Sequence, residues 1–317
     1  MRAQLLVVLV CPAAAVWGLP QPSPHTQPSR EYCRRGSACW PDAAALAALN
    51  KALEPELHRQ IKYEGGNATY PAPVPGGAQQ PLFGYGEESL PALVVAEEPT
   101  GPCFAGTPAN ETRPTCLAST RNNEAQWGPA IVAFPLTTAH VVTAVRFARE
   151  HNLCLSVLGT GHDFMNRHDG CPDGFLIRTT LLKSIEWDMD DSRGEGGTVR
   201  VGSGHTFNEI ARSASDRNRI VASGWTPTVG VAGWSLGGGH GPFNGWAGLG
   251  VDNFVEAEIV LANGTLITAN ETHNTDLHWA LRGGGGSTWG VLTHLTLRAH
   301  TFQTTGFHER NAVWFFI

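Results

Sequence analysis

The stretch Gly230–Gly241, GVAGWSLGGGHG, allows two incompatible interpretations of the chain. It contains GWSLG at residues 233–237, which matches the G-x-S-x-G pattern around the nucleophilic serine of many hydrolases. The same glycines carry no side chain, so they would equally let the backbone approach a phosphate closely. The residues on either side of this stretch decide between a hydrolase and a cofactor-binding protein.

The surroundings of Ser235 argue against a hydrolase. A nucleophilic serine in this pattern needs a hydrophobic strand directly before it and a helix directly after it. The preceding segment is broken by Pro227 and Gly230, and further glycines and a proline follow Gly237. These residues disfavour both a regular strand and a helix at the required places. We therefore expect Ser235 not to be a nucleophile.

Two other glycine-containing loops occur, GTGHDF at residues 159–164 and GGGG at residues 283–286. Each lies next to a predicted strand, and consecutive backbone N–H groups in such loops can bind a diphosphate. The Rossmann fingerprint is not met, because no helix is predicted after GTGHDF. One loop alone is best explained as a tight turn, but three loops at strand ends favour a shared ligand.

Histidine and aspartate side chains near the first of these loops raise the question of a metal site. His162-Asp163 and His168-Asp169 follow one another in a glycine-containing segment. Zinc and iron sites usually show tighter geometry, such as two histidines at positions i and i+4 of a helix. We therefore expect no metal ion here.

Composition bounds the class of protein. The 317 residues are 42% hydrophobic and carry a formal charge of −6, from 22 basic and 28 acidic side chains. A chain of this length can bury a large core. Nucleic-acid binding requires clustered Lys and Arg, and the sequence shows no such cluster. We expect no nucleic-acid partner.

Predicted helices and strands are mixed along the chain, which indicates an α+β fold. Residues 19–125 are rich in Pro and Gly and are expected to form an extended arm with one helix, at about residues 41–57. From residue 126 to 303, short strand-like runs and helical runs follow one another. We expect two lobes there, at about residues 126–205 and 206–303.

A hairpin is predicted near the C-terminal end of the second lobe. The segment NFVEAEIVLANGTLITA contains two strand-like runs joined by Asn263-Gly264. Asn-Gly is the strongest short hairpin signal, because a type I′ turn needs positive φ at both positions. We expect that turn type here.

The N-terminus has the pattern of an export signal. Residues 1–18 combine one arginine with an apolar run that is too short to span a bilayer, and a Pro-rich segment follows. No later segment approaches about 18 uninterrupted apolar residues, so we expect a secreted protein that does not bind a membrane. Four N-x-[ST] sequons fit glycosylation in that compartment: Asn67, Asn110, Asn263 and Asn270.

Cysteine usage agrees with an oxidising compartment. Removal of residues 1–18 leaves six cysteines, an even number that suggests disulfides. Six cysteines allow about 15 connectivities, so the pairing stays open. Sequence proximity favours the pairs Cys33–Cys39, Cys103–Cys116 and Cys154–Cys171.

The ordered set of motifs resembles one family. A strand leading into GTGHDF, then SGWTPTVGVAGWSLGGGHG, then NTDLHWALRGGGGSTWGVLTHLTLRAH, is similar to the berberine-bridge-enzyme-like oxidases, which are vanillyl-alcohol-oxidase-type flavoproteins. The similarity spans about Trp127–His300, with weaker support from CRRGSACW at residues 33–40. It implies a PCMH-type FAD-binding domain at residues 126–303, with FAD between its two α+β lobes.

The resemblance also implies roles for individual residues. His162 would bond covalently to the 8α position of the flavin, and a neutral imidazole is a competent nucleophile near pH 7. The other residues that the resemblance places around FAD are Gly159, Thr160, Gly161, Asp163, Thr228, Gly230, Gly233, Gly237, Gly238, Gly239, His240, Gly241 and Asp252.

Two departures from the family pattern limit what the resemblance implies. Many relatives carry a cysteine, as a second flavin link, where this chain has Thr226 or Trp225, so a single histidyl link is expected. Relatives also continue into a substrate-binding domain, of which residues 304–317 would be the start in a truncated chain.

The expected activity follows from the same resemblance. It is oxidation of an alcohol or a carbohydrate-like small-molecule substrate, with O2 as the acceptor and H2O2 as the product. No catalytic residue is assigned, because relatives supply the base largely from the later domain. The alternative is a truncated flavin-binding or inactive secreted protein without turnover.

Overall fold

The structure is a computed structural model that describes residues 31–53, 131–163, 167–169, 171 and 174–301, with the backbone of Leu93–Val95. The expected signal peptide, most of the expected arm and the segment 304–317 lie outside these residues. Outside them too lie the residues of one expected disulfide and two of the sequons, namely Cys103, Cys116, Asn67 and Asn110.

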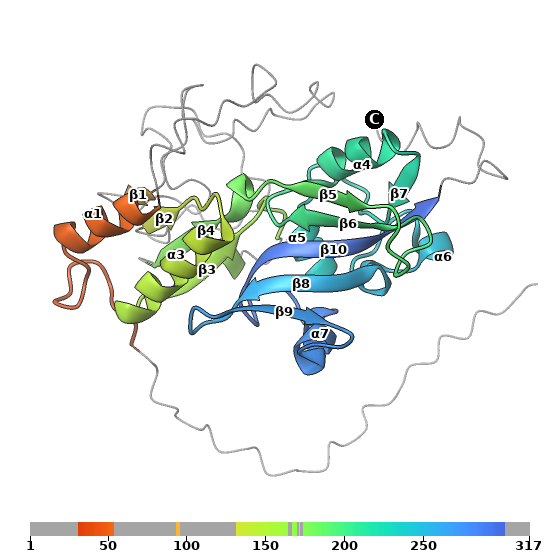
Figure 1. The fold of residues 1–317 in the computed structure, drawn as a ribbon. Helices are drawn as coiled ribbons and strands as arrows, with labels where there is room; N and C mark the ends of the chain where they lie inside the picture. Colours follow the sequence, from red (N-terminus) through yellow and green to blue (C-terminus); the bar gives the residue numbers. More distant parts are fainter. Residues whose placement is uncertain are drawn as a thin grey trace, which may run out of the picture. The chain divides into compact units, whose positions relative to one another are not determined.

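The first sheet carries parallel strands that end at the same edge. Its order is β1-β2-β4-β3; β2 and β3 run parallel to β4, and β1 pairs antiparallel with β2 (Figure 1). Because parallel strands end at one edge, the loop after β3 lies beside the short 3-10 helix η2 that follows β4. The bounds are β1 (Leu93–Val95), β2 (Ile131–Ala133), β3 (Leu155–Leu158), β4 (Phe175–Arg178) and η2 (Thr179–Leu181).

Two helices pack with the first sheet. Helix α3 (Thr138–Glu150) connects β2 to β3 and is capped by Thr137, whose side chain accepts a hydrogen bond from the His140 amide (3.2 Å). Helix α1 (Ala43–Ala52) begins after Asp42, which caps it in the same way. Buried side chains of α1, α3 and β4 form one core. Helix α1 lies within the range, about residues 41–57, where the sequence predicts a helix.

The second sheet is antiparallel and is built around β10. Strand β10 pairs with β6, with β8 and, at its C-terminal end, with β7, and the main order is β5-β6-β10-β8-β9 (Figure 1). The bounds are β5 (Ile185–Asp188), β6 (Thr198–Gly202), β7 (Arg219–Val221), β8 (Phe254–Val260), β9 (Leu266–Asn270) and β10 (Val291–Thr301).

Helices α4, α5 and α7 contribute buried side chains to the core of the second sheet. They share this core with the inward-facing residues of β6, β8 and β10. The bounds of the remaining elements are α4 (Phe207–Ser215), α5 (Val231–Leu236), α6 (Asn244–Ala247), α7 (Thr275–Leu281), η1 (Arg167–Asp169) and η3 (Gly250–Asp252).

The α+β fold class is confirmed, but the chain passes from the first sheet to the second at an earlier residue than expected. The sequence places β5 and β6 in the first lobe, whereas both belong to the second sheet, where β6 pairs with β10. The change therefore falls between η2 and β5, not near residue 205. A local sequence pattern indicates a strand but does not indicate the strand with which it pairs. The boundary between the two sheets depends on pairing across roughly 90 residues, so the local pattern does not predict it.

The predicted hairpin is present with a different turn. Strands β8 and β9 pair antiparallel around Asn263-Gly264. Gly264 has a φ of +78°, but Asn263 is not among the residues with positive φ. The Gly264 amide donates to the Leu261 carbonyl (2.8 Å), so the turn is longer than type I′, and only the glycine adopts the left-handed conformation.

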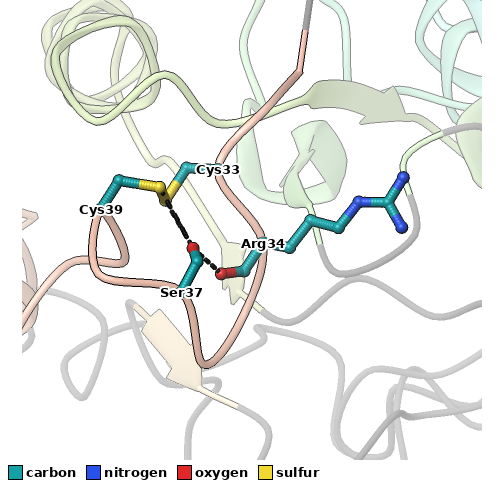
Figure 2. The surroundings of a disulfide bond; sticks show 4 residues. All are labelled: Cys33, Arg34, Ser37 and Cys39. Atoms are coloured by element: carbon teal, nitrogen blue, oxygen red, sulfur yellow. Dashed lines mark hydrogen bonds between the residues drawn. A yellow bond between two sulfur atoms is a disulfide. The ribbon is translucent and has the colours of Figure 1, made fainter.

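Two of the three expected disulfides lie within the described residues, and both are confirmed. Cys33 pairs with Cys39, and Cys154 pairs with Cys171. Figure 2 shows the first pair with Ser37, whose hydroxyl donates to the Arg34 carbonyl (2.5 Å). The second pair joins the start of β3 to the residues after η1, and so closes the loop between them.

No helix within the described ranges combines the length and the apolar character needed to cross a membrane. The sequons at Asn263 and Asn270 lie at the two ends of β9. Asn263 is exposed at the hairpin tip, whereas the Asn270 amide donates to Glu256 (2.8 Å). Glycosylation at either asparagine stays a prediction.

Candidate functional site

Two loops from distant parts of the sequence meet at the edge where β3 ends. We call residues 159–163 the first loop and residues 224–230 the second loop. The Gly230 amide donates a hydrogen bond to Thr160 Oγ1 (2.9 Å), and His162 Nε2 lies 2.8 Å from Thr228 Oγ1. The first loop therefore contributes the side chains of Thr160 and His162, and the second loop the amide of Gly230 and the side chain of Thr228. The sequence predicts that these segments converge on one ligand, and the structure places them in contact.

The second loop is fixed by the N-terminus of α4. The Phe207 amide donates to the Val229 carbonyl (3.0 Å), and the Asn208 amide donates to the Pro227 carbonyl (2.9 Å). These two bonds hold the backbone on both sides of Thr228. The orientation of the Thr228 side chain is therefore set by the second sheet and its helix.

The first loop is held mainly by its neighbours. Thr180 of η2 donates a hydrogen bond to the Gly159 carbonyl (3.4 Å). Gly161 has a φ of +82°, a conformation that L-residues with side chains rarely adopt. The disulfide Cys154–Cys171 closes the segment that contains the loop. The strand end, the threonine and the disulfide together define where His162 lies.

A third loop, residues 283–290, completes the arrangement. The Gly285 amide donates to the Leu236 carbonyl at the end of α5 (2.8 Å). On its other side, a Cβ built on Gly285 would lie 3.3 Å from a terminal nitrogen of Arg167, which follows the first loop. All three glycine-containing loops of the sequence are thus neighbours, as their common position at strand ends predicts.

His162 is half-buried, and burial lowers the pKa of its imidazole from the ordinary value. The ring is therefore neutral at neutral pH. One ring nitrogen, Nε2, contacts Thr228. No described residue bonds to the other nitrogen, Nδ1. A neutral imidazole with one nitrogen held and the other available can act as a nucleophile.

Asp163 is committed to an ion pair that the sequence analysis missed. Its carboxylate accepts hydrogen bonds from the Arg167 amide (2.9 Å) and from Arg167 Nε (2.9 Å) and Nη2 (3.2 Å). These bonds raise the pKa of the Arg167 guanidinium. The i,i+4 spacing of Asp163 and Arg167 was the available signal. Its effect is to place a cation between the first loop and the third.

Several glycines leave open space beside the backbone. A Cβ built on Gly233 or Gly238 would meet no atom of the described residues within 4 Å. At Gly159 and Gly161 the nearest atoms would lie 3.9 Å and 3.8 Å away. Gly233 and Gly238 are therefore open on that side among the described residues, whereas Gly159 and Gly161 each have one side chain at van der Waals distance. All four have room to face a ligand. The role of each as a cofactor contact stays a prediction.

Other glycines on the same list are packed against the protein. A Cβ on Gly230 would lie 3.0 Å from Thr160 Oγ1, and a Cβ on Gly239 would lie 2.7 Å from the ring of Trp234. At Gly241 it would overlap the carbonyl oxygen of Ser223. These positions need glycine because other parts of the chain approach the backbone closely. Gly237 ends α5, and a Cβ there would lie 3.3 Å from a carbonyl of the same helix.

Helix α5 forms inside the quoted stretch, where the glycines predict irregular structure. Trp234 explains it: its ring lies edge-on to Phe207, with centroids 4.8 Å apart, and its indole N–H donates to the His240 carbonyl (2.9 Å). Packing of this side chain and of two buried residues in the core outweighs the low helix propensity of glycine. His240 itself is exposed and contributes its backbone to this bond.

Ser235 lies in the same helix and is 1% exposed. Its hydroxyl makes no hydrogen bond with any described residue. A nucleophilic serine requires a base within hydrogen-bond reach and an exposed position on a sharp turn. The arrangement agrees with the expectation that Ser235 is not a nucleophile.

Asp252 is used locally. Its carboxylate accepts a hydrogen bond from the Leu249 amide (2.8 Å) and so caps η3. A Cβ on Gly248 would lie 2.9 Å from this carboxylate, which shows how closely the turn folds around it. Asp252 thus fixes the turn before β8, and any contribution to ligand binding acts through that turn.

A second polar group lies beside the second loop. His205 is buried; its Nδ1 lies 3.3 Å from Glu209 Oε2, and its Nε2 has no hydrogen-bond partner among the described residues. Lys183 bonds to both oxygens of Glu209 (2.7 Å each). Nothing in the sequence around His205 indicates this environment, since a histidine in a loop carries no local signal of burial.

The two histidines considered as metal ligands have different surroundings. His162 faces Thr228, whereas His168 is buried, and burial, partly offset by Asp163, lowers the pKa of its imidazole. Within the part of the chain that the structure describes, no three His, Cys, Asp or Glu side chains are grouped as a metal site.

Comparison with known proteins gives the family of this site. Residues 129–270 match a family model described as an FAD binding domain. The FAD-linked oxidoreductase ZEB1 of Gibberella zeae is 35% identical over 271 residues, which cover 84% of this chain and 46% of ZEB1. The chain spans about half the length of the curated relatives it matches.

Solved structures agree with this match. The VAO-type flavoprotein MtVAO615 from Myceliophthora thermophila is 25% identical, with a TM-score of 0.62 over 85% of this chain and 49% of its own. The glucooligosaccharide oxidase of Acremonium strictum, described with a 6-S-cysteinyl, 8α-N1-histidyl FAD, is 30% identical, with a TM-score of 0.50 over 55% of this chain and 35% of its own. A variant of berberine bridge enzyme is 26% identical, with a TM-score of 0.50 over 54% of this chain and 34% of its own.

Proposed function

Since residues 129–270 belong to the FAD binding domain family, we propose that this chain is part of a secreted FAD-linked oxidase. FAD is the cofactor that the domain and the named relatives indicate. The proposed reaction is oxidation of an alcohol or carbohydrate-like substrate, with O2 as the acceptor and H2O2 as the product. The resemblance to berberine-bridge-like and VAO-type flavoproteins is confirmed.

The residues present fit a dinucleotide cofactor. Gly233 and Gly238 of the α5 region leave open space beside the backbone among the described residues, and a Cβ on Gly159 or Gly161 of the first loop would make only an ordinary van der Waals contact. Backbone N–H groups without side chains suit a diphosphate. The guanidinium of Arg167, fixed by Asp163 next to Gly285, adds positive charge at the same place. These residues would hold FAD, which accepts a hydride from the substrate and passes electrons to O2.

One observation carries the proposal: His162 is half-buried at the contact of the first and second loops, with Nε2 held by Thr228. We propose that this histidine bonds to the 8α carbon of the flavin. The histidyl FAD of the glucooligosaccharide oxidase supports this assignment. Where the resemblance places a second linking cysteine, this chain has Thr226 or Trp225, so one link is proposed.

Secretion and the substrate class have separate support. The apolar residues 1–18 and the two disulfides fit an oxidising, extracellular compartment. The solved neighbours include an oxidase named for a glucooligosaccharide, which favours a sugar-like substrate. O2 as the acceptor fits the oxidases among the same neighbours.

The test is retention of flavin after denaturation. Purified protein is denatured in detergent and run on a gel, and flavin fluorescence should stay with the wild-type chain and be absent from His162→Ala. His273→Ala, a substitution at an exposed turn, serves as the control and should retain the flavin. A wild-type band without flavin, together with no binding of added FAD, would contradict the proposal.

A second candidate function, flavin binding without turnover, is favoured by one observation. The carboxylate next to His162, Asp163, is already paired with Arg167, so the first loop offers no free carboxylate as a base. H2O2 release is therefore measured with primary alcohols and oligosaccharides on the flavin-loaded protein. Retained flavin with H2O2 supports the oxidase; retained flavin without H2O2 supports the second candidate.

A further inference from the structure

We propose that Thr228 is a positioning residue for His162. Its hydroxyl holds the imidazole with the proton on Nε2, so that Nδ1 carries the free electron pair and becomes the nitrogen that bonds to the 8α carbon of the flavin. As this N–C bond forms, an 8α C–H bond breaks and the imidazole loses its Nε2 proton. The flavin takes up the two electrons, and O2, the acceptor of the proposed function, would reoxidise it to give H2O2. The inference rests on the proposed function, since it concerns the same histidyl link. It adds a residue from the second loop that decides how the histidine of the first loop is presented.

The contact between the two side chains supports this role. The distance from Nε2 to Thr228 Oγ1 is 2.8 Å, and 66 residues of sequence separate the two. A neutral imidazole has one N–H and one free electron pair, and the hydrogen bond at one nitrogen sets which form the ring adopts. None of the described residues bonds to Nδ1, so the Thr228 contact is the one that fixes the ring within that part of the chain.

In the proposed arrangement, Nε2 donates the hydrogen bond and Thr228 Oγ1 accepts it. Thr228 is half-buried, so its hydroxyl can donate its own proton to water while it accepts one from Nε2. With the proton on Nε2, the unprotonated Nδ1 lies on the opposite side of the ring from Thr228. The nitrogen that faces away from the second loop is then the nucleophilic one.

Thr228 is rigid enough to act in this way. Its two neighbours, Pro227 and Val229, accept hydrogen bonds from the amides of Asn208 and Phe207 in the first turn of α4. Two residues further along, the Gly230 amide bonds to Thr160 of the first loop. The threonine is thus held by the second sheet on both sides while its side chain reaches the first loop.

A hydrogen bond of ordinary net strength shifts an equilibrium between two forms by about five- to tenfold. Removal of the hydroxyl should therefore weaken the preference for the reactive form by a similar factor. The expected consequences are slower covalent attachment and a mixture of linkages, with some flavin bound through Nε2.

The experiment compares full-length wild type, Thr228→Val, Thr228→Ala and Thr228→Ser, with Thr268→Val on the exposed side of β9 as the control. For each, the fraction of flavin that stays attached after denaturation is measured. The histidyl-flavin peptide is then isolated, and NMR identifies the nitrogen that carries the flavin. Thermal unfolding shows that each variant is folded, and the valine and alanine variants provide two independent removals of the hydroxyl.

The wild type, Thr268→Val and Thr228→Ser should carry the flavin on Nδ1 alone. In Thr228→Val and Thr228→Ala, the attached fraction should fall about five- to tenfold, or a second linkage through Nε2 should appear. Wild-type attachment through Nδ1 alone in a folded Thr228→Val or Thr228→Ala would overturn the role of Thr228 and leave the proposed function standing. A wild-type protein with no histidyl flavin would overturn both.

Discussion

The backbone amide of Gly230 donates a hydrogen bond to the side chain of Thr160, 70 residues earlier in the sequence. The approach is so close that a Cβ on Gly230 would lie 3.0 Å from Thr160 Oγ1 and 3.1 Å from Thr160 Cγ2. The first and second loops therefore behave as one structural unit. Substitutions in this unit should separate residues needed for the fold from residues that face the cofactor.

Gly230→Ala should destabilise the protein. The new methyl group must displace Thr160 or the loop backbone, which costs about 1–3 kcal/mol when a packed region is overfilled. Chemical denaturation gives the free energy of unfolding, and the same samples give the flavin content. Flavin binding should fall together with stability, since both loops move apart. An unchanged free energy of unfolding would show that the contact is not tight.

Gly233→Ala, unlike Gly230→Ala, should increase the stability of the protein. Gly233 lies inside α5, and a Cβ there meets no atom of the described part of the chain within 4 Å. Alanine in a helix interior is more favourable than glycine by roughly 0.5–1 kcal/mol, so the flavin-free protein should become more stable. FAD binding, measured by quenching of flavin fluorescence, should weaken if the cofactor fills that space. Stronger binding would place the cofactor elsewhere.

Stability should fall as the pH is lowered from 7.5 to 5.5. Burial lowers the pKa of His162, His168, His278 and His300 in the folded protein. The unfolded chain, with the ordinary pKa of about 6.5, then binds more protons than the folded one in this range. The contribution of these four histidines to the free energy of unfolding is present above about pH 6.5 and is lost as the pH falls below it. Denaturant titrations at the two pH values should show a smaller drop in His162→Gln than in the wild type.

Removal of the disulfide Cys154–Cys171 should loosen the loop that carries His162. The two cysteines are 17 residues apart, and closing a loop of that length contributes about 3 kcal/mol in the chain-entropy model. The double variant Cys154→Ser/Cys171→Ser should lose this amount and retain less flavin. The matched control, Cys33→Ser/Cys39→Ser, opens a loop of 6 residues and should lose less, about 2 kcal/mol, with normal flavin retention.

Glu258 should contribute to stability at neutral pH. A hydrogen bond from His294, together with the hydrogen bond and charge of Arg200, lowers the pKa of this carboxyl to about 2, despite a partly opposing effect of burial. The contribution is present above about pH 4.5 and is lost as the pH falls toward 2. Glu258→Gln should lose about 1–2 kcal/mol at pH 7, after allowance for solvent screening, and show less difference from the wild type near pH 3.

Sequence analysis located the elements of this site better than their contacts. The strand before Gly159, the helix that begins after Asp42 and the two near-neighbour disulfides follow from local patterns, and the structure has all of them. These features depend on spacing within about 20 residues, where propensity and capping rules apply.

Contacts between distant segments could not be predicted from the sequence. Helix α5 exists because Trp234 packs on Phe207, and a glycine-rich sequence contains no sign of that packing. The pairing of Asp163 with Arg167 is local and competes with the predicted role of Asp163 at the cofactor; the i,i+4 spacing indicates that the pair can form, and the geometry shows that it does. The assignment of β5 and β6 to the second sheet depends on β10, which lies far along the chain.

The central position of β10 has a consequence for the order of events during biosynthesis. Strand β6 ends at Gly202, but its partner β10 begins only at Val291. At a synthesis rate of roughly 5–20 residues per second, β6 waits about 5–20 seconds for that partner. The glycine loops cannot assemble before then, because the α4 region that fixes the second loop packs on the same sheet. Cofactor capture is therefore a late event, and a ribosome that pauses between residues 202 and 291 would expose an incomplete sheet to chaperones.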